Sequence, residues 1–426
     1  MQSHCQEGRR ATKAALSAPC VLALVLAGCS VGSQPETAAT ASAPAERSAT
    51  AREGETETTA PGPSTTVEAP EAIAKGSFEI TPLRSRPRTE RLPAFQAVQV
   101  ASANYPAGLA AAPDGRVFYS ELWGGHIRVI RKDGTVDPKP WADVNSRFGI
   151  RWTEFFPGGL SGIAFDPDFK HNHFVYVVTQ VPDTKTGLAK RSLVVRYKEV
   201  KHRGTAPRVI LRLPASKFDN TYSLVFGPDG MLYVPTGFLG ASRRAGVNPL
   251  RDLRGKILRV TPTGEAPGDN PYEPRAPRVW ALGFKNTFDL AFFPGGEAAV
   301  GGDNGTVGHD EINLLMPGHH YGYPEHEGIT RKRRLTPPMF DYGGNATAPV
   351  GIVYYSGRRF PALRGRFLIC ENHGDGMLAL RIDRSDPGRL RRMTPILDTC
   401  TLDVVATPDG SIYFSDAGAV YRLALA

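Results

Sequence analysis

The chain has 426 residues, 41% of them hydrophobic, with 45 glycines and 36 prolines. This composition supports a sizeable core and many turns, so it favours short strands in a large fold over a helical bundle. The formal net charge of +9 suits anionic glycans, lipid headgroups or simple solubility. Residues 1–28 are typical of an export signal, and an exported protein has little access to nucleic acid, so we expect no nucleic-acid partner.

The first 28 residues are typical of a bacterial lipoprotein signal. Basic residues precede the short apolar run ALSAPCVLALVLAG, residues 15–28, which is too short for a comfortable membrane span. The run ends in Leu-Ala-Gly directly before Cys29, a lipobox-like sequence. We therefore expect lipidation of Cys29 and anchoring at the cell envelope, facing outside the cytoplasm. An ordinary secretory signal with an incidental Cys29 is the alternative.

Residues 29–90 are expected to be the lipidated cysteine and a disordered tether. The part from residue 30 to about 77 contains no Phe, Trp or Tyr and is rich in Ala, Thr, Ser, Pro and Glu. Such a segment buries too little apolar surface to offset its conformational entropy. Residues 91–426 are then the folded domain, in which Cys370 and Cys400 are the remaining cysteines. An exported protein meets oxidising conditions, in which these two cysteines can form a disulfide. The alternative is that both are buried free thiols.

One local pattern recurs along the folded domain. A hydrophobic strand, a Pro-Asp-Gly-like turn and a β-branched or aromatic strand follow one another, because proline and glycine preset the turn. The turn prolines are Pro113, Pro167, Pro228, Pro294 and Pro408. Their spacings are 54, 61 and 66 residues, then 114, and residues 350–370 supply the unit that the last interval hides. Six such units predict an all-β fold, a six-bladed β-propeller.

The segment VWALGFKNTFDLAFFPGGEAAVGGDNGTVGHDEINLLMPGHHYGYP, residues 279–324, carries a more specific signal. It resembles the glucose/sorbosone dehydrogenase family, six-bladed quinoproteins that oxidise sugars with pyrroloquinoline quinone (PQQ) and calcium. The segments GGLSGIAFDPDF, GKILRVTPTG and APVGIVYYSGRRFPALRG match the family as well, and together the resemblance covers about residues 100–425. It implies a histidine general base, calcium on the quinone oxygens, and cationic and amide side chains on the three carboxylates of the cofactor.

The family's base histidine precedes the strand of LVFGPDG. Counting back from Phe226 without a gap, this position falls on Asp219. A carboxylate accepts a proton, but its unperturbed pKa of about 3.9 makes it a weaker base near neutrality unless burial raises it. Asp219 and Asn220 are also typical turn residues, so a replacement base and a turn pair both remain open.

Two cofactor contacts have counterparts in this sequence. The family's Arg-Asn pair aligns with Lys285 and Asn286; lysine keeps the charge but not the planar fork of arginine. The resemblance places the backbone ligands of calcium at Gly305 and Thr306, with Asp303 nearby. Backbone ligands tolerate side-chain change, so this loop is either a calcium site or a structural acidic turn. The family's other cofactor contacts are replaced, which makes the cofactor site degenerate.

Three functions are therefore compatible with the sequence. The first is an extracytoplasmic sugar oxidoreductase of this family with an altered quinone site. The second is a non-catalytic propeller that binds a glycan or a protein partner, for which the basic run 331–334 would be suited. The third is a metal site built from loop histidines, namely His309, His319, His320, His326 and His373.

Overall fold

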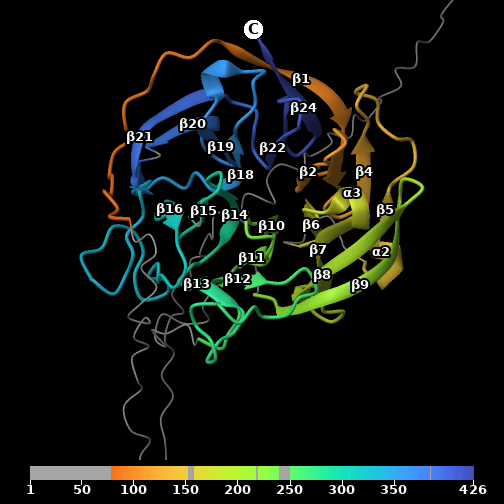
Figure 1. Ribbon diagram of the computed structural model, residues 1–426, viewed down its shortest axis with the longest axis horizontal. Helices are drawn as coiled ribbons and strands as arrows, with labels where there is room; N and C mark the ends of the chain where they lie inside the picture. Colours follow the sequence, from red (N-terminus) through yellow and green to blue (C-terminus); the bar gives the residue numbers. More distant parts are fainter. Residues whose placement is uncertain are drawn as a thin grey trace, which may run out of the picture.

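A computed structural model describes residues 78–151, 158–216, 219–238, 250–296, 298–306, 308–383 and 385–426. The expected signal peptide, Cys29 and the tether up to residue 77 lie outside these residues. Six four-stranded antiparallel sheets are arranged as blades around one axis (Figure 1). The predicted six-bladed β-propeller is therefore confirmed.

Each blade begins with an inner strand, and the six inner strands together line the central channel. The inner strands of blades 1 to 6 are β2 (Leu109–Ala111), β6 (Leu160–Phe165), β10 (Val225–Phe226), β14 (Thr287–Phe292), β18 (Pro349–Tyr355) and β22 (Val404–Ala406). The second strands are β3 (Val117–Ser120), β7 (Phe174–Pro182), β11 (Leu232–Thr236), β15 (Ala299–Asp303), β19 (Arg366–Glu371) and β23 (Ile412–Ser415). All five predicted turn prolines, and the turn within 350–370, lie between these first and second strands.

The third and fourth strands complete the blades toward the outside. The third strands are β4 (His126–Ile130), β8 (Ala189–Val200), β12 (Lys256–Val260), β16 (Glu311–Leu315), β20 (Gly376–Asp383) and β24 (Ala419–Leu425). The outer strands are β5 (Ala142–Asp143), β9 (Arg203–Pro214), β13 (Val279–Leu282), β17 (Phe340–Asp341), β21 (Asp386–Leu397) and, in blade 6, β1 (Phe95–Ser102). Since β1 pairs with β24 from Phe95↔Leu425 to Ser102↔Ala419, the start of the domain closes the ring against its end.

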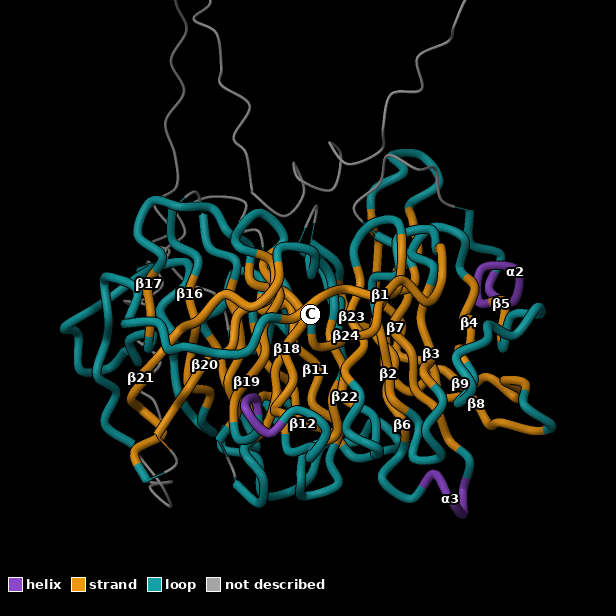
Figure 2. The backbone as a smooth tube through the Cα atoms, turned by 90° about the horizontal axis from the view of Figure 1, so that it is seen from above, coloured by secondary structure: helices purple, strands orange, loops and turns teal. Residues whose placement is uncertain are grey.

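The core lies between the blades. Strands β15 and β16 are buried at every position because both of their faces pack against neighbouring blades. One apolar cluster joins blades 1 and 2, for example through Phe118 and Val177. Short helices α2 (Val144–Phe148) and α3 (Phe169–Asn172) and the 3-10 turn η1 (Pro361–Leu363) lie in loops, as Figure 2 shows for α2 and α3 at the edge of the ring. No helix in the described part of the chain is long and apolar enough to cross a bilayer.

We call the end of the channel where the inner strands begin the upper end, and the end where they lead into the proline turns the lower end. Loops that join the outer strand of one blade to the inner strand of the next lie at the upper end. Loops between second and third strands lie there too. Asp219, Lys285 and Asn286 precede inner strands, and Asp303 ends a second strand, so the fold brings all four to the upper end.

Residues 78–94 form an N-terminal strap that runs outside blade 5 before it enters β1, as the orange segment beside β21 shows (Figure 1). The Thr81 and Leu83 N–H groups donate to the carbonyls of Gly388 and Met339 at 3.1 and 3.0 Å, and Ile80 and Leu83 pack against the apolar cluster of blades 4 and 5. The domain boundaries expected from the sequence placed residues 78–90 in the disordered tether. That assignment is corrected, because these two apolar side chains and the strap's backbone bonds fasten the segment to the propeller.

Candidate functional site

The upper end of the channel holds a buried ion pair between blades 3 and 4. Lys285 Nζ lies 3.3 Å from Asp219 Oδ2, and the two side chains are 1% and 2% exposed. The same ammonium donates to the carbonyl of Asn304 at 3.2 Å. Burial raises the pKa of Asp219, and the charge of Lys285 opposes that rise. The residue at the expected base position is therefore held by the residue at the expected cofactor position, and their charges cancel.

Asp303 fastens the start of β14. Its carboxylate accepts from the backbone N–H groups of Lys285 and Asn286 at 3.1 and 2.9 Å, and from the Thr287 hydroxyl at 3.1 Å. Complete burial raises the pKa of Asp303 to about 6. Both oxygens are used by these donors, so Asp303 positions Lys285 and Asn286 and offers little to a metal ion.

Polar side-chain atoms without a protein partner gather beside the ion pair. In the described part of the chain, neither amide atom of Asn286 or of Asn304 has a hydrogen-bond partner, nor does the hydroxyl of Thr347. Both asparagines are 0% exposed and Thr347 is 6% exposed. The Asn304 N–H donates to the Asn286 carbonyl at 3.1 Å, which holds the two residues together. Leaving a buried polar group unpaired costs about 1–3 kcal/mol, so these groups are suited to a hydrogen-bonding ligand or water.

The loop expected to bind calcium is closed by its own hydrogen bonds. Gly305 N–H donates to Asp310 at 3.0 Å, and the other oxygen of Asp310 accepts from the backbone of Thr347 and Ala348, each at 2.8 Å. The Thr306 carbonyl accepts from His309 N–H at 2.9 Å. No group of three His, Cys, Asp or Glu side chains among the described residues is arranged to hold a metal ion. The Thr306 carbonyl and both Asp303 oxygens are therefore already engaged by hydrogen-bond donors, which weakens them as calcium ligands.

Among the described residues, the cations at the upper end also do not fit PQQ. A cofactor with three carboxylates requires cations that are free to pair with it. Lys285 is paired with Asp219, Arg254 with Asp252 at 2.7 Å, and Arg86 of the strap with Glu371 at 3.4 Å. Each of these three cations at the upper ends of blades 3 to 5 already faces a carboxylate. No reaction step through PQQ is derived from this arrangement.

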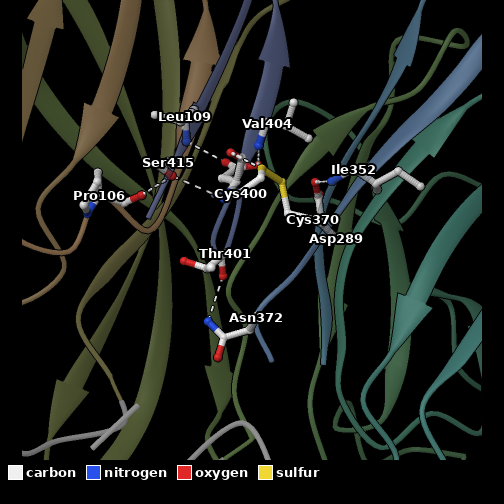
Figure 3. Close-up of a disulfide and its surroundings, with 11 residues drawn as sticks. Pro106, Leu109, Asp289, Ile352, Cys370, Asn372, Cys400, Thr401, Val404 and Ser415 are labelled. Atoms are coloured by element: carbon white, nitrogen blue, oxygen red, sulfur yellow. Dashed lines mark hydrogen bonds between the residues drawn. A yellow bond between two sulfur atoms is a disulfide. The ribbon is translucent and has the colours of Figure 1, made fainter. Parts of the chain in front are cut away.

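The joint between blades 5 and 6 is covalent. Cys370 in β19 forms a disulfide with Cys400, which precedes β22, across a Cα–Cα distance of 5.2 Å (Figure 3). Beside it, the Asn372 amide donates to the Thr401 carbonyl at 2.7 Å. Of the two alternatives that the sequence left open for these cysteines, the structure has the disulfide.

The six inner strands line a cavity of about 640 Å³, here called the channel cavity, which extends to the proline turns and includes Asp289 of β14 and Asp403, just before β22, in its lining. Asp289 accepts from Ser223 and from Ile352 N–H, and Asp403 accepts from the N–H groups of Leu109 and Val404 at 2.6 and 2.7 Å. Burial raises the pKa of Asp289 to about 6. Burial and the charge of Asp289 raise the pKa of Asp403 well above its usual range. The two carboxylate charges in this cavity therefore repel one another, and protonation of one carboxylate removes the repulsion.

Sequence reasoning placed Asp219, Lys285, Asn286 and Asp303 in one site, and the structure brings them together. It missed Asn304, Thr347 and the two aspartates of the channel cavity, Asp289 and Asp403. The motif GGDNG, which contains Asn304, carried a signal for the first of these. Asp289 stands two residues after a strand start and gave no such signal.

Comparison with known proteins gives consistent matches. A family model described as Glucose / Sorbosone dehydrogenase matches residues 103–423. Quinoprotein glucose dehydrogenase B from Acinetobacter calcoaceticus is 28% identical over 54% of this chain and 52% of its own length, so the match spans about half of that relative. Aldose sugar dehydrogenase YliI from Escherichia coli is 24% identical over 73% of this chain and 86% of its own. A solved structure from Thermus thermophilus, described as a putative oxidoreductase (glucose dehydrogenase), superposes with a TM-score of 0.65 at 29% identity, covering 78% of this chain and all of that one.

Proposed function

The chain belongs to the glucose/sorbosone dehydrogenase family, and we propose that it binds a sugar or glycan at the upper end of its channel without oxidising it through PQQ. The observation that carries this proposal is the buried Lys285–Asp219 ion pair. It occupies the positions that the family resemblance assigns to the base and to a cationic cofactor contact. The pair adds no net charge to the site, and the neighbouring Asp303 carboxylate adds a negative one near pH 7, which disfavours a tricarboxylate and suits an uncharged molecule.

The hydrogen-bonding groups beside the pair support a hydroxyl-rich ligand. The amides of Asn286 and Asn304 each offer both a donor and an acceptor, and the Thr347 hydroxyl does the same. Sugar hydroxyl groups are also both donors and acceptors, so they match such a set. A site built to hydrogen-bond hydroxyl groups discriminates against ligands that lack them, because its polar groups would then be buried unpaired.

Proton abstraction is poorly served at Asp219. A general base must reach the proton it removes within about 3 Å, or through one water. The Asp219 side chain is 2% exposed and its Oδ2 faces the Lys285 ammonium. Binding without turnover therefore needs no rearrangement of the pair, whereas catalysis would have to break it.

Calorimetry of the full chain with a panel of aldoses and oligosaccharides tests this function. We expect binding of at least one sugar in the absence of PQQ, and a loss of about five- to hundredfold in affinity for Asn286→Ala, because leaving a buried hydrogen-bonding group of the ligand unpaired costs about 1–3 kcal/mol. Asn345→Ala, in an exposed loop at the same end, is the matched control and should bind normally. Equal affinity of the two variants would argue against this site.

A sugar oxidoreductase with an altered quinone site is the second candidate. It is favoured by Asn286, which is kept at the family's cofactor position, and by the names of the relatives, which are glucose and aldose dehydrogenases. The full chain should be titrated with PQQ, with and without calcium, and then given aldoses and an artificial electron acceptor. Tight, calcium-dependent PQQ binding with dye reduction would establish this candidate and reject the first. If PQQ does not bind at high micromolar concentration, the oxidoreductase candidate is rejected and sugar or glycan binding without oxidation remains.

We further propose that the protein is exported and anchored through a lipid on Cys29, which lies outside the described residues. The lipobox-like Leu-Ala-Gly-Cys sequence supports this location. Labelled palmitate should be incorporated into the chain and not into Cys29→Ser. Incorporation into both would place the lipid elsewhere, and into neither would leave an ordinary secretory signal.

A further inference from the structure

Positive charge is concentrated in one part of the propeller. Residues 331–392 contain thirteen Arg and Lys against five Asp and Glu, a net charge of +8 out of the chain's +9. This stretch covers the loop before β17, β17 itself, which is the outer strand of blade 4, and most of blade 5. Since the rest of the chain is close to neutral, the excess charge belongs to one surface and not to the whole molecule.

Within blade 5, three arginines lie in a row across three neighbouring strands. Arg381 of β20 pairs with Arg392 of β21. On its other side, Phe367 pairs with Leu380, so Arg366, the residue before Phe367, is next to Arg381. Directly opposite residues of an antiparallel pair point to the same face, and like charges there are destabilising. We call these three residues the arginine row.

The arginine row has too few neighbouring carboxylates to neutralise its three positive charges. Glu90 of the strap pairs with Arg366 at 2.9 Å and with Arg381 at 3.5 Å. Arg392 donates to the carbonyl of Arg391 at 2.8 Å, and it faces no carboxylate in the described part of the chain. One carboxylate therefore serves three guanidinium groups that lie side by side.

The row borders a cavity that an anion can enter. This cavity, of about 650 Å³, is lined by Arg364, Arg366, Arg381, Asp383, Arg391 and Arg392. The Arg381 side chain is 60% exposed, whereas Asp383 is taken by Arg391 at 2.6 Å. Because β19 starts at Arg366, the cavity lies toward the lower end of blade 5, apart from the Lys285–Asp219 site at the upper end.

We propose that this cavity is a second binding site, specific for a phosphate group, and that the arginine row holds its oxygens. A planar guanidinium presents paired N–H donors that match two phosphate oxygens at once. The anion would supply the negative charge that Glu90 alone leaves short, so binding relieves repulsion already present in the folded protein. A phospholipid headgroup and a soluble phosphate ester carry the same group. This proposal does not depend on the proposed function of the upper end.

Thermal unfolding of the full chain with inorganic phosphate tests the site, at constant ionic strength kept with sodium chloride. We expect phosphate to raise the Tm of the wild type, and calorimetry to show at least tenfold weaker phosphate binding for Arg392→Gln and for Arg381→Gln. Without phosphate, Arg392→Gln should be as stable as the wild type or more so, because it removes one repelling charge. This second measurement separates lost binding from misfolding.

Arg389→Gln is the matched control, since Arg389 is an exposed arginine on the same strand that does not line the cavity. It should keep the phosphate response of the wild type. Equal Tm shifts in the control and in both row variants, or the same shift with sodium chloride alone, would overturn the proposal. The natural source follows from comparing dihexanoyl phosphatidylglycerol with glucose 6-phosphate at equal concentration. A stronger response to the lipid indicates a headgroup site, and a stronger response to the sugar phosphate indicates a soluble ester.

Discussion

The ion pair at the upper end and the two aspartates of the channel cavity both place carboxylates away from water, but they offset the cost in different ways. Both bury carboxylates, and burial penalises their charge. At the upper end Asp219 faces Lys285 at 3.3 Å, so opposite charges compensate one another. In the channel cavity Asp289 and Asp403 lie without such a partner among the described residues, and the charge of Asp289 makes Asp403 harder to ionise. We therefore expect the stability of the upper end to require both Lys285 and Asp219, and the stability of the channel cavity to depend on protonation of its aspartates.

The largest expected effect comes from breaking the upper pair. Lys285→Met leaves the Asp219 carboxylate buried without its counter-charge, which should lower the free energy of unfolding by about 3–5 kcal/mol. The double variant Lys285→Met/Asp219→Asn removes both charges and should recover most of that loss. Urea denaturation at pH 7 measures both.

Lys332→Met is the control for this experiment, since Lys332 is an exposed lysine paired with Glu325 at 2.9 Å. Its effect should stay within about 1 kcal/mol. If Lys285→Met behaved like Lys332→Met, the upper pair would not be the compensated unit described above.

The disulfide provides a comparison that does not involve charge. Cys400→Ser opens the link to Cys370, 30 residues away, and should cost about 3 kcal/mol by the chain-entropy estimate. The loss should be nearly the same at pH 5 and pH 8, and a reductant should lower the Tm of the wild type but not that of the variant. A loss that varied strongly with pH would mean that the bond mainly supports the neighbouring carboxylates.

In the channel cavity, substitution of Asp289 is expected to change the free energy of unfolding less than loss of Lys285 does, and to raise it. The folded-state pKa of Asp289 is about 6, above the ordinary value of 3.8, so the folded protein binds this proton more tightly than the unfolded chain. Its contribution to stability is present below about pH 4 and is lost as pH rises toward 6. Asp289→Asn should therefore raise the free energy of unfolding at pH 7.5 by about 1–2 kcal/mol and flatten its pH dependence. Denaturation at several pH values checks this, and a destabilised, equally pH-dependent variant would contradict it.

The smallest effect is expected from calcium. The oxygens of Asp303 and Asp310 are already hydrogen-bonded to backbone N–H groups, so the upper end is compensated without a metal ion. Addition of EDTA or of calcium to the full chain should leave the Tm unchanged. A clear rise with calcium that EDTA reverses would restore the calcium loop implied by the family resemblance.

The fold was predictable because each blade repeats one local signal. Proline and glycine at a turn fix the backbone whatever the rest of the chain does, and at Pro228 the predicted turn ends in Gly230 at a φ of 73°. The same reasoning failed for residues 78–90. No local pattern marks them as ordered, because their backbone bonds go to Gly388 and Met339 and their apolar side chains pack against blades 4 and 5, all more than 200 residues later in the chain.

The candidate site was predictable by position and not by chemistry. Alignment to the family placed Asp219 and Lys285 at the upper end, but nothing local indicates that they pair, because they belong to loops of different blades. The arginine row was hidden for a similar reason. It exists through the register of two strand pairs, and a shift of one residue in either would turn its side chains to the other face.

The closure of the ring by β1 has a consequence for how the protein is made. The Gln96 side chain bonds to the carbonyl of Leu425, 329 residues away in sequence, beside the strand pair that completes blade 6. The ring therefore cannot close until β24 has emerged from the ribosome and, for an exported chain, has crossed the membrane. Contacts between such distant residues slow folding. Until then the edges of β1 and of blade 6 are unpaired, and a chaperone that shields these edges would have the longest time to act on them.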